Sequence, residues 1–216
     1  MSSGRADYHS LVRREVFHLI PRGGCVLDVG GGDGATAAAL RASGHVARIG
    51  VVDRVAPAPG HRLDFAVQGD LGDPALLAGL GEREGPFDTI LCLDVLEHFA
   101  DPWHLVAQLH GLLAPGGCIV ASIPNVQYYE VVLPLLLRGE WRYRDAGVLD
   151  RTHLRFFGRR EAAQLLTSGG LRLDVIEPCR PGARRLRWAN ALSFGLLSGF
   201  LSQQFLLRVV RDPVTG

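Results

Sequence analysis

Lysine is absent from this sequence, and all 23 of its basic residues are arginines. This composition is typical of a GC-rich genome rather than of a binding adaptation. Without lysine, the chain cannot supply the Tyr-x-x-x-Lys pair that many nicotinamide-dependent oxidoreductases use. The sequence also has no large excess of positive or negative charge, because its formal net charge is only +1. No global attraction to nucleic acid or to an anionic membrane is therefore expected.

Disulfide patterns, secretion signals and membrane spans are missing as well. The four cysteines, Cys25, Cys92, Cys118 and Cys179, form no Cys-x-x-Cys pair, which predicts reduced, mostly buried thiols. The N-terminal MSSGRADYHS lacks the apolar stretch of a secretory signal, so we expect a cytoplasmic protein. The one long apolar tract, residues 189–207, is interrupted by polar residues. No integral membrane segment is expected from it.

Short apolar runs alternate with helical stretches along the chain, and 47% of the residues are hydrophobic. The pattern predicts one α/β domain over residues 1–216, with a Rossmann-like, seven-stranded, mostly parallel sheet flanked by helices. Strands are expected at residues 25–29, 46–52, 63–67, 87–93, 118–123, 171–176 and 205–210. Helices are expected at residues 9–19, 35–43, from 73 onward, 101–113, 159–168 and 186–199. A substrate-side insertion at 124–158 and a C-terminal helix with an antiparallel last strand at 184–216 complete the prediction.

The segment VLDVGGGDG, residues 26–34, inserts glycines between a buried strand and a helix. Bare glycine backbone lets a ligand lie against the mouth of an open α/β sheet. The loop also fits a loose G-x-G-x-x-[GA] dinucleotide pattern, so alone it is ambiguous. Asp28 argues against a dinucleotide, because its carboxylate would repel a pyrophosphate but could hold the cationic amino acid end of S-adenosylmethionine (SAM). Asp53, at the end of the second strand, suits the ribose hydroxyls of either cofactor.

Five motifs in order resemble the class I SAM-dependent methyltransferase family over residues 8–177: VLDVGGGDG, VVD, QGD, FDTILCLDVLEHFADP and LLAPGGCIVASIPN. The resemblance implies that SAM is the cofactor and S-adenosylhomocysteine the product. The cofactor-binding positions that it implies are Asp28, Gly30, Gly31, Gly32, Asp53, Arg54, Asp70, Leu71, Leu93, Asp94 and His98. Asp70 would meet the adenine amino group. Gly31 departs from the family, which often has cysteine or serine there.

Two further segments supply candidate catalytic residues. LEHF at 96–99 is typical of a branch that resembles ubiquinone-biosynthesis methyltransferases, and GVLDRTHLRFFG at 147–158 resembles a subgroup associated with glycan or natural-product pathways. If the acceptor must lose a proton, His153 or His98 is the candidate base, because imidazole titrates near neutral pH. Asp150 could orient His153. Both segments could instead be structural, as a helix-initiating pair and as a turn that fixes the insertion.

Arginine and aromatic residues crowd the predicted insertion, and such side chains suit anionic groups and sugar or ring stacking. The predicted acceptor-binding residues are Tyr128, Tyr129, Trp141, Arg142, Arg144 and Arg155. We expect a small-molecule or glycan acceptor, such as a sugar or nucleotide sugar, methylated on oxygen or nitrogen. A solvated charged face is the alternative. No metal site is expected, because the acidic and histidine residues show no H-x-x-x-H or similar ligand spacing.

Other functions stay open at this point. An NAD(P)-dependent oxidoreductase could use the same glycine loop, and a methyltransferase-like module could bind SAM without catalysis. A nucleic acid methyltransferase is disfavoured, because the [DNS]-P-P-[FYW] motif is absent and the net charge is low. The apolar helix predicted at residues 186–199 could cover the sheet, pair with a second copy in a homodimer, or rest on a membrane surface.

Overall fold

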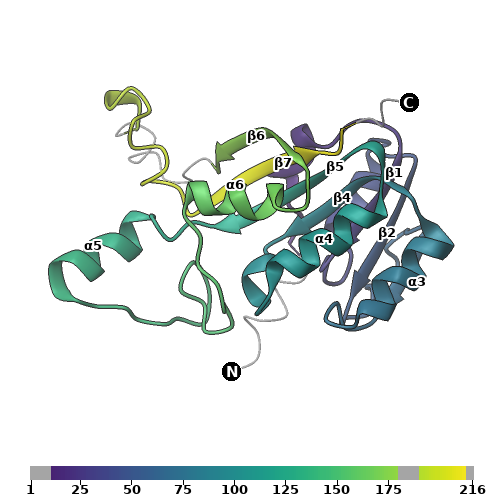
Figure 1. Ribbon diagram of the computed structural model, residues 1–216, viewed down its shortest axis with the longest axis horizontal. Helices are drawn as coiled ribbons and strands as arrows, with labels where there is room; N and C mark the ends of the chain where they lie inside the picture. Colours follow the sequence, from purple (N-terminus) through teal and green to yellow (C-terminus); the bar gives the residue numbers. More distant parts are fainter. Residues whose placement is uncertain (1–10, 180–189, 213–216) are drawn as a thin grey trace.

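The structure is a computed structural model that describes residues 11–179 and 190–212. Its centre is a seven-stranded sheet with helices on both faces (Figure 1). The strands are β1 Cys25–Val29, β2 Arg48–Asp53, β3 Phe65–Gln68, β4 Phe87–Leu93, β5 Leu113–Pro124, β6 Arg172–Pro178 and β7 Gln204–Val210. The α-helices are α2 Ala35–Ala42, α3 Pro74–Glu84, α4 Pro102–Leu112, α5 Tyr129–Arg138 and α6 Arg159–Thr167, and the 3₁₀ helices are η1 Arg14–Leu19 and η2 Leu96–His98.

The strand order is β3-β2-β1-β4-β5-β7-β6. The first five strands are parallel, whereas β7 runs antiparallel between β5 and β6. The predicted Rossmann-like sheet with an antiparallel last strand is therefore confirmed. The chain order reverses at β1, which pairs with β2 on one side and with β4 on the other. In open α/β sheets, ligands bind at such a switch point, beyond the carboxyl ends of the strands.

The alternation of side chains along β1 determines on which face of the sheet each of them lies. Leu27 and Val29 pack in a core cluster with residues of α3, α4 and α6, the helices in front of the sheet in Figure 1. Val26 packs in a second cluster with residues of η1 and α2. Because side chains alternate along a strand, Asp28 shares the face of Val26. Its carboxyl group therefore points toward the side where η1 and α2 lie.

Helix caps fix the two helices that border the sheet edge next to the site. The Asp73 side chain accepts a hydrogen bond from the Ala75 amide at the start of α3, and Asp101 accepts one from the His104 amide at the start of α4. In both helices a proline follows the cap, as the sequence predicts. The predicted strand and helix positions agree with the structure here to within a few residues.

The predicted insertion contains a helix that the sequence analysis missed. Helix α5 has Pro134 in its interior, and it lies apart from the sheet at the left of Figure 1. The returning chain packs against it through a separate apolar cluster that includes Tyr128, Val131, Leu149 and Trp141. The insertion therefore has a small core of its own.

Of the helix predicted at residues 186–199, the described part is helical only at residues 190–192. Residues 193–201 form consecutive turns, and Phe194 and Gly195 have positive φ angles of 52° and 81°, which interrupt a right-handed helix. Residues 180–189 lie outside the described part. Of the helix predicted at residues 9–19, the structure describes the 3₁₀ turns of η1.

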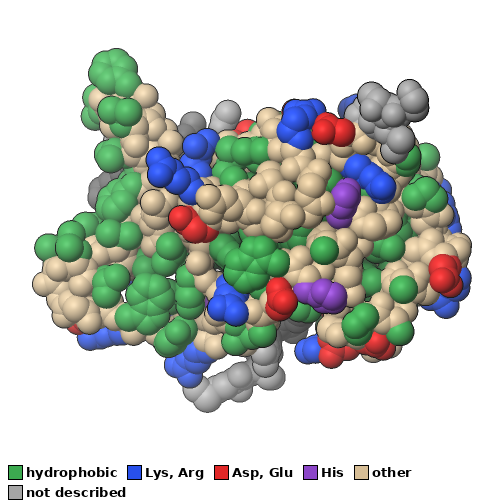
Figure 2. All heavy atoms as spheres, in the orientation of Figure 1, with side chains coloured by type: hydrophobic (Ala, Val, Ile, Leu, Met, Phe, Trp, Pro, Cys, Tyr) green, Lys and Arg blue, Asp and Glu red, His purple; other side chains and the backbone are tan. Residues whose placement is uncertain are grey.

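Large apolar side chains are exposed at the end of the molecule that carries α5 and the turns after residue 190 (Figure 2). They are Leu133, Leu135, Leu136, Leu137, Leu192, Phe194, Leu196 and Leu197. Within the described ranges, every helix is too short or too polar to cross a bilayer.

Gly50 controls the packing of β2, the strand that carries Asp53. A Cβ atom at Gly50 would lie 2.1 Å from the Phe65 ring, and that ring stacks on Phe87 with centroids 6.0 Å apart. We predict that Gly50→Ala lowers the free energy of unfolding by about 1–3 kcal/mol through overpacking. The matched control, Gly79→Ala in the interior of α3, meets no atom within 4 Å and should raise it by about 0.4–1 kcal/mol. Urea unfolding measures both, and equal effects would contradict the packing argument.

Candidate active site

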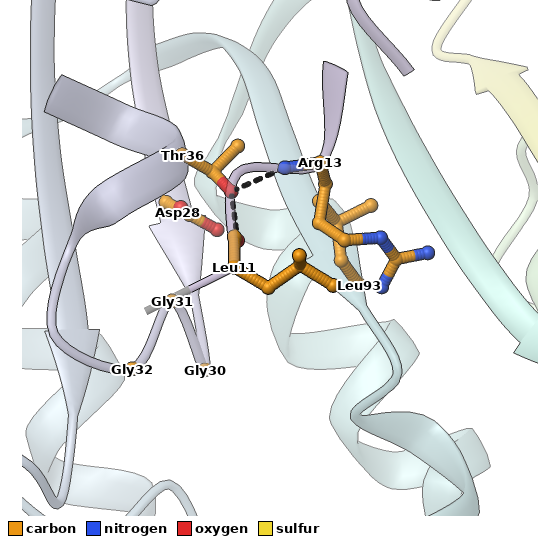
Figure 3. A pocket seen from close by; sticks show the side chains of 8 residues that line it. All are labelled: Leu11, Arg13, Asp28, Gly30, Gly31, Gly32, Thr36 and Leu93. Carbon is orange, nitrogen blue, oxygen red and sulfur yellow. Dashed lines mark hydrogen bonds between the residues drawn. The ribbon is translucent and has the colours of Figure 1, made fainter. Parts of the chain in front are cut away.

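The glycine loop after β1 forms one wall of a pocket at the switch point of the sheet. Residues from β1, the loop, the segment before η1, α2 and β4 line it (Figure 3): Leu11, Arg13, Asp28, Gly30, Gly31, Gly32, Thr36 and Leu93. A Cβ atom at Gly30, whose φ is +69°, would lie 2.5 Å from Val95, and one at Gly31 would lie 2.7 Å from the Asp28 carboxyl group. The loop is therefore bare because side chains would collide, and the glycine at position 31 accommodates Asp28.

Asp28 is buried beneath this loop, with 1% of its surface exposed. Its Oδ2 atom has no hydrogen-bond partner among the described residues. Burial, together with the negative charge of Asp53, raises the pKa of Asp28 to about 7, although the positive charge of Arg13 opposes the shift. A buried carboxylate without a partner is costly, so the position favours a cationic ligand group.

Asp53 ends β2 with both carboxyl oxygens held by backbone amides. Oδ2 accepts from the Gly32 amide at 2.8 Å, and Oδ1 accepts from the Val55 amide, also at 2.8 Å. A carboxylate oxygen can accept more than one hydrogen bond, so each oxygen keeps capacity for a ligand hydroxyl. The contact with Gly32 also ties the predicted ribose residue directly to the glycine loop.

Arg54 and Asp70 meet beyond the ends of β2 and β3. Arg54 donates to Asp70 Oδ2 at 2.5 Å, and both side chains are more than half exposed. The Gly72 amide and Arg54 lower the pKa of Asp70. Leu71 is buried beside them. The structure thus brings Asp53, Arg54, Asp70 and Leu71 to the same edge of the sheet as the pocket.

A polar network joins η1 to the ends of β4, β5 and β7. The Asp94 carboxylate accepts from Arg13 at 2.5 Å, from the Ser122 hydroxyl at 2.7 Å and from the Gln204 amide at 2.8 Å. Arg13 also donates to Gln204 and to Glu15. Burial lowers the pKa of Arg13, but Asp94 and Glu15 more than offset this and raise it. Asp94 was predicted at the pocket, whereas Arg13, Ser122 and Gln204 were not.

Sequence spacing could not reveal this network, because its members come from four separate segments. Asp94 has a positive φ of 55°, a conformation that asparagine and aspartate adopt more readily than most residues. This backbone turns its carboxylate toward Arg13 and Ser122. Arg13 and Leu11 in turn form the wall of the pocket opposite the glycine loop, and the Thr36 hydroxyl bonds both of their backbones (Figure 3).

Beyond Asp94, three side chains converge from two distant segments. Glu97 and His98 come from η2, and His153 comes from the turn after residue 150. The rings of His98 and His153 meet edge to face with centroids 4.8 Å apart, and His153 Nε2 lies 3.9 Å from Glu97 Oε1. We call these three residues the Glu97 cluster. The sequence predicted both histidines, and the structure adds Glu97 as their buried neighbour.

Asp150 does not orient the His153 ring as predicted. Its Oδ1 atom accepts from the backbone amide and hydroxyl of Thr152, at 2.8 and 2.6 Å. The His153 ring instead donates from Nδ1 to the Val148 carbonyl oxygen at 3.0 Å. A short aspartate side chain bonds its own turn more easily than a ring farther on. Asp150 therefore shapes the turn, and Val148 fixes the ring.

The predicted acceptor residues differ in exposure. Tyr128, Tyr129 and Trp141 pack in the cluster of the insertion, where Trp141 meets Phe156 edge to face. Arg155 donates to the Ala100 carbonyl oxygen and lies over Trp103. These contacts give all four a packing role. Arg142 and Arg144 are 76% and 60% exposed at the side chain and pair with Glu140 and Glu130.

Comparisons with known proteins agree with this geometry. A family model described as a methyltransferase domain matches residues 4–175. This chain is a class I SAM-dependent methyltransferase. The ubiquinone biosynthesis O-methyltransferase of Xylella fastidiosa strain M23 is 34% identical over 179 residues, which cover 78% of this chain and 67% of that protein. A protein of the same name from Azotobacter vinelandii is 32% identical over 140 residues, covering 59% of this chain and 60% of the relative.

Solved structures share the fold of this methyltransferase. A Burkholderia thailandensis 1,6-didemethyltoxoflavin-N1-methyltransferase, crystallised with 1,6-didemethyltoxoflavin and S-adenosylhomocysteine, matches with a TM-score of 0.62 and 19% identity over 97% of this chain and 82% of that one. A SAM-dependent methyltransferase from Archaeoglobus fulgidus matches with a TM-score of 0.63 and 16% identity, over 96% and 94% of the two chains. The cofactor of the present enzyme is therefore SAM, and the oxidoreductase and non-catalytic alternatives fall away.

Asp28 should make the ligand-free methyltransferase less stable as pH rises. The pKa of this carboxyl group is about 7 in the folded protein, whereas its ordinary value is 3.8. Between about pH 4 and pH 7 the folded state therefore holds a proton that the unfolded state has lost, and the folded state loses stability as the pH rises through this range. We predict that Asp28→Asn is more stable than wild type at pH 8 by a few kcal/mol, since one pKa unit is about 1.4 kcal/mol. The difference should shrink toward pH 5 in urea unfolding. A difference that does not change with pH would contradict the assignment.

Proposed function

We propose that this enzyme moves the methyl group of SAM to a hydroxyl oxygen of a small-molecule acceptor that binds at the Glu97 cluster. The observation that carries the proposal is the position of this cluster. Its members Glu97 and His98 lie in η2, shortly after Leu93, which lines the cofactor pocket, and the charge of Arg13, another lining residue, acts on Glu97. The cluster combines a buried carboxyl group with two imidazoles. The names of the relatives, ubiquinone biosynthesis O-methyltransferases, support oxygen as the methylated atom.

The residues of the pocket fit the two ends of SAM. Asp28 supplies a buried carboxyl oxygen without a partner among the described residues, suited to the ammonium group of the methionine part. Gly30, Gly31 and Gly32 expose the backbone beside it. The pocket has a volume of about 60 Å³, about that of two water molecules, so it accommodates one end of the cofactor, and the rest extends along the sheet edge.

That extension leads toward Asp53, which we propose binds the two ribose hydroxyls. Its backbone hydrogen bonds fix the carboxylate before a ligand arrives. Asp70 and Leu71 are proposed for the adenine amino group and ring, with Arg54 holding Asp70 in position. Leu93 lines the pocket at the end of β4, and Asp94, the next residue, holds Arg13 of the opposite wall. SAM supplies a methyl group on a good leaving group, so the task of the protein is mainly alignment.

A calorimetric titration tests the cofactor half of the proposal. We predict that wild type binds S-adenosylhomocysteine and does not bind NADH. Asp53→Ala should weaken S-adenosylhomocysteine binding at least about tenfold, because two hydrogen bonds to a charged group are lost. Asp145→Ala, which removes a carboxylate that is 90% exposed on the insertion, is the matched control and should bind like wild type. NADH binding by wild type would overturn the proposal.

For the acceptor class, the proposal is a sugar that carries a negative charge, such as a nucleotide sugar. The exposed guanidinium groups of Arg142 and Arg144 on the insertion support it, because arginine binds phosphate in a bidentate manner.

Replacing Arg142 and Arg144 together with alanine should raise the acceptor KM several-fold and leave kcat unchanged, since the lost contacts bind ground state and transition state alike. Arg160→Ala, on the exposed side of α6, is the control. Initial rates with nucleotide sugars and with uncharged sugars and phenols measure the effect. An unchanged KM in the double variant would rule out the anionic acceptor.

A further inference from the structure

The Glu97 cluster has the composition and geometry of a metal site that the sequence did not predict. We infer that Glu97, His98 and His153 bind one divalent transition-metal cation, and that this cation coordinates the acceptor hydroxyl beside the methyl group of SAM. The inference rests on the proposed function and specifies how the acceptor oxygen is activated. Four observations on the described residues support it: the spacing of the donor atoms, the orientation of the imidazoles, the burial of the carboxyl group and the rigidity of the backbone.

The donor atoms are close enough to share one ion. One ligand atom from each of Glu97, His98 and His153 lies within 4.8 Å of the other two, and His153 Nε2 lies 3.9 Å from Glu97 Oε1. Around a tetrahedral ion with bonds of about 2.1 Å, donor atoms lie about 3.4 Å apart. Small side-chain rotations would therefore bring the three ligands into coordination.

The backbone presents the correct nitrogen of each imidazole. His153 donates from Nδ1 to the Val148 carbonyl oxygen at 3.0 Å, and His98 donates from Nδ1 to the Thr152 carbonyl oxygen at 3.2 Å. A carbonyl oxygen can only accept, so in the neutral rings the proton is on Nδ1 and the lone pair on Nε2. Metal-binding histidines almost always donate their second ring nitrogen in this way. Both rings of the cluster share that arrangement.

Glu97 supplies a buried carboxyl group whose oxygens no hydrogen-bond donor of the described residues reaches, although the positive charge of Arg13 acts on it. The side chain is completely buried. The separation of 3.9 Å from His153 is too long for a hydrogen bond. Burial and the nearby charge of Asp94 raise the pKa of Glu97 well above its ordinary value. A bound cation would offset the cost of an ionised carboxylate at this position.

Backbone hydrogen bonds hold the two segments of the cluster together. The Glu97 carbonyl oxygen accepts from the amides of Leu154 and Arg155, at 2.8 and 3.1 Å. Arg155 also donates through its side chain to the Ala100 carbonyl oxygen. The turn that carries His153 is thereby fixed onto η2, although 54 residues separate it from His98. The ligands are preorganised without any metal, which reduces the ordering cost of binding.

The donor set indicates the class of cation. Imidazole nitrogens suit zinc, copper, iron and nickel, and the carboxylate also suits manganese, whereas magnesium prefers oxygen ligands alone. Two histidines and one carboxylate leave coordination positions open for a substrate oxygen. His98 is only half-buried, so an acceptor can approach from its side of the cluster.

The reaction balances with SAM as the methyl donor. Coordination to the cation lowers the pKa of the acceptor hydroxyl, and its proton leaves to water. The acceptor oxygen then forms a bond to the methyl carbon while the carbon–sulfur bond breaks. The electron pair of that bond stays on sulfur, which becomes the neutral thioether of S-adenosylhomocysteine. The cation changes no oxidation state, so no oxidant or reductant is required.

Manganese binding tests the inference without an activity assay. Protein freed of metal with a chelator is titrated with Mn²⁺ and, separately, Zn²⁺ by calorimetry, and Mn²⁺ binding is followed by electron paramagnetic resonance. Wild type should bind one Mn²⁺ and show nitrogen spin-echo modulation from imidazole. Glu97→Gln, His153→Gln and the half-buried His98→Gln should each bind at least about tenfold more weakly. His104→Gln, at an exposed position on α4, is the matched control and should bind like wild type.

Titration of the same samples with S-adenosylhomocysteine separates the two proposals and shows that each variant is folded. If wild type binds S-adenosylhomocysteine but neither metal, or if the Glu97, His98 and His153 variants bind metal as well as wild type does, the metal inference is overturned and the methyltransferase proposal stands. If wild type fails to bind S-adenosylhomocysteine, the proposed function itself is wrong. Loss of metal binding in the cluster variants with retained S-adenosylhomocysteine binding supports the inference.

Discussion

Two buried carboxyl groups with unpartnered oxygens govern this site. Asp28 is the penultimate residue of β1 and Glu97 lies in η2. Among the described residues no hydrogen-bond donor reaches Asp28 Oδ2 or either carboxyl oxygen of Glu97. Burying such a group costs free energy unless a cation or proton compensates it. The fold keeps both at one edge of the sheet, where the chain order reverses. We interpret the two positions as complementary to two cations, the ammonium group of SAM at Asp28 and a metal ion at Glu97.

Backbone groups rather than side chains hold most of the functional residues. The amides of Gly32 and Val55 hold Asp53, and the carbonyl oxygens of Val148 and Thr152 hold the two histidines. Asp94 is the exception, because side chains of Arg13, just before η1, and of β5 and β7 donate to it. Through Arg13 that network also links the wall of the cofactor pocket to the edge of the Glu97 cluster. The hydrogen bonds of Arg13 and Asp94 thus connect the position that we propose for the cofactor with the one that we propose for the acceptor.

The centre of the sheet was predictable because β1, β2 and β4 are short, mostly apolar runs, each followed by a polar or glycine residue. β1 and β4 match their predicted bounds, as does the start of α3 after Asp73. The cofactor edge was predictable for the same reason, since parallel strands bring Asp28 and Asp53 to one end of the sheet. Helix α5 was missed because its apolar residues, which surround Pro134, lie in a segment dominated by aromatics and arginines. The helix predicted from the leucines after residue 190 fails at Phe194 and Gly195, where the backbone has positive φ.

The cluster was only half predictable. His98 and His153 stand out in their motifs, but no spacing rule connects residues of η2 with a turn 54 positions away. Their meeting depends on the Glu97 carbonyl oxygen, which accepts from the amides of Leu154 and Arg155. Backbone hydrogen bonds of this kind can form between residues of almost any type, so the sequence does not reveal them. The same limit explains why Asp150 was assigned to the ring of His153, although its carboxylate bonds Thr152.

The central claim is that one edge of the sheet holds the methyl donor and the acceptor oxygen together, and a crystal structure with S-adenosylhomocysteine bound tests it most directly. We expect the amino group of the ligand within about 3 Å of Asp28 Oδ2, a hydrogen-bond distance, and its sulfur facing the Glu97 cluster. A sulfur atom more than about 10 Å from His153 Nε2 would contradict the claim, because no group of the cluster could then reach the proton or the oxygen of an acceptor aligned with the methyl group.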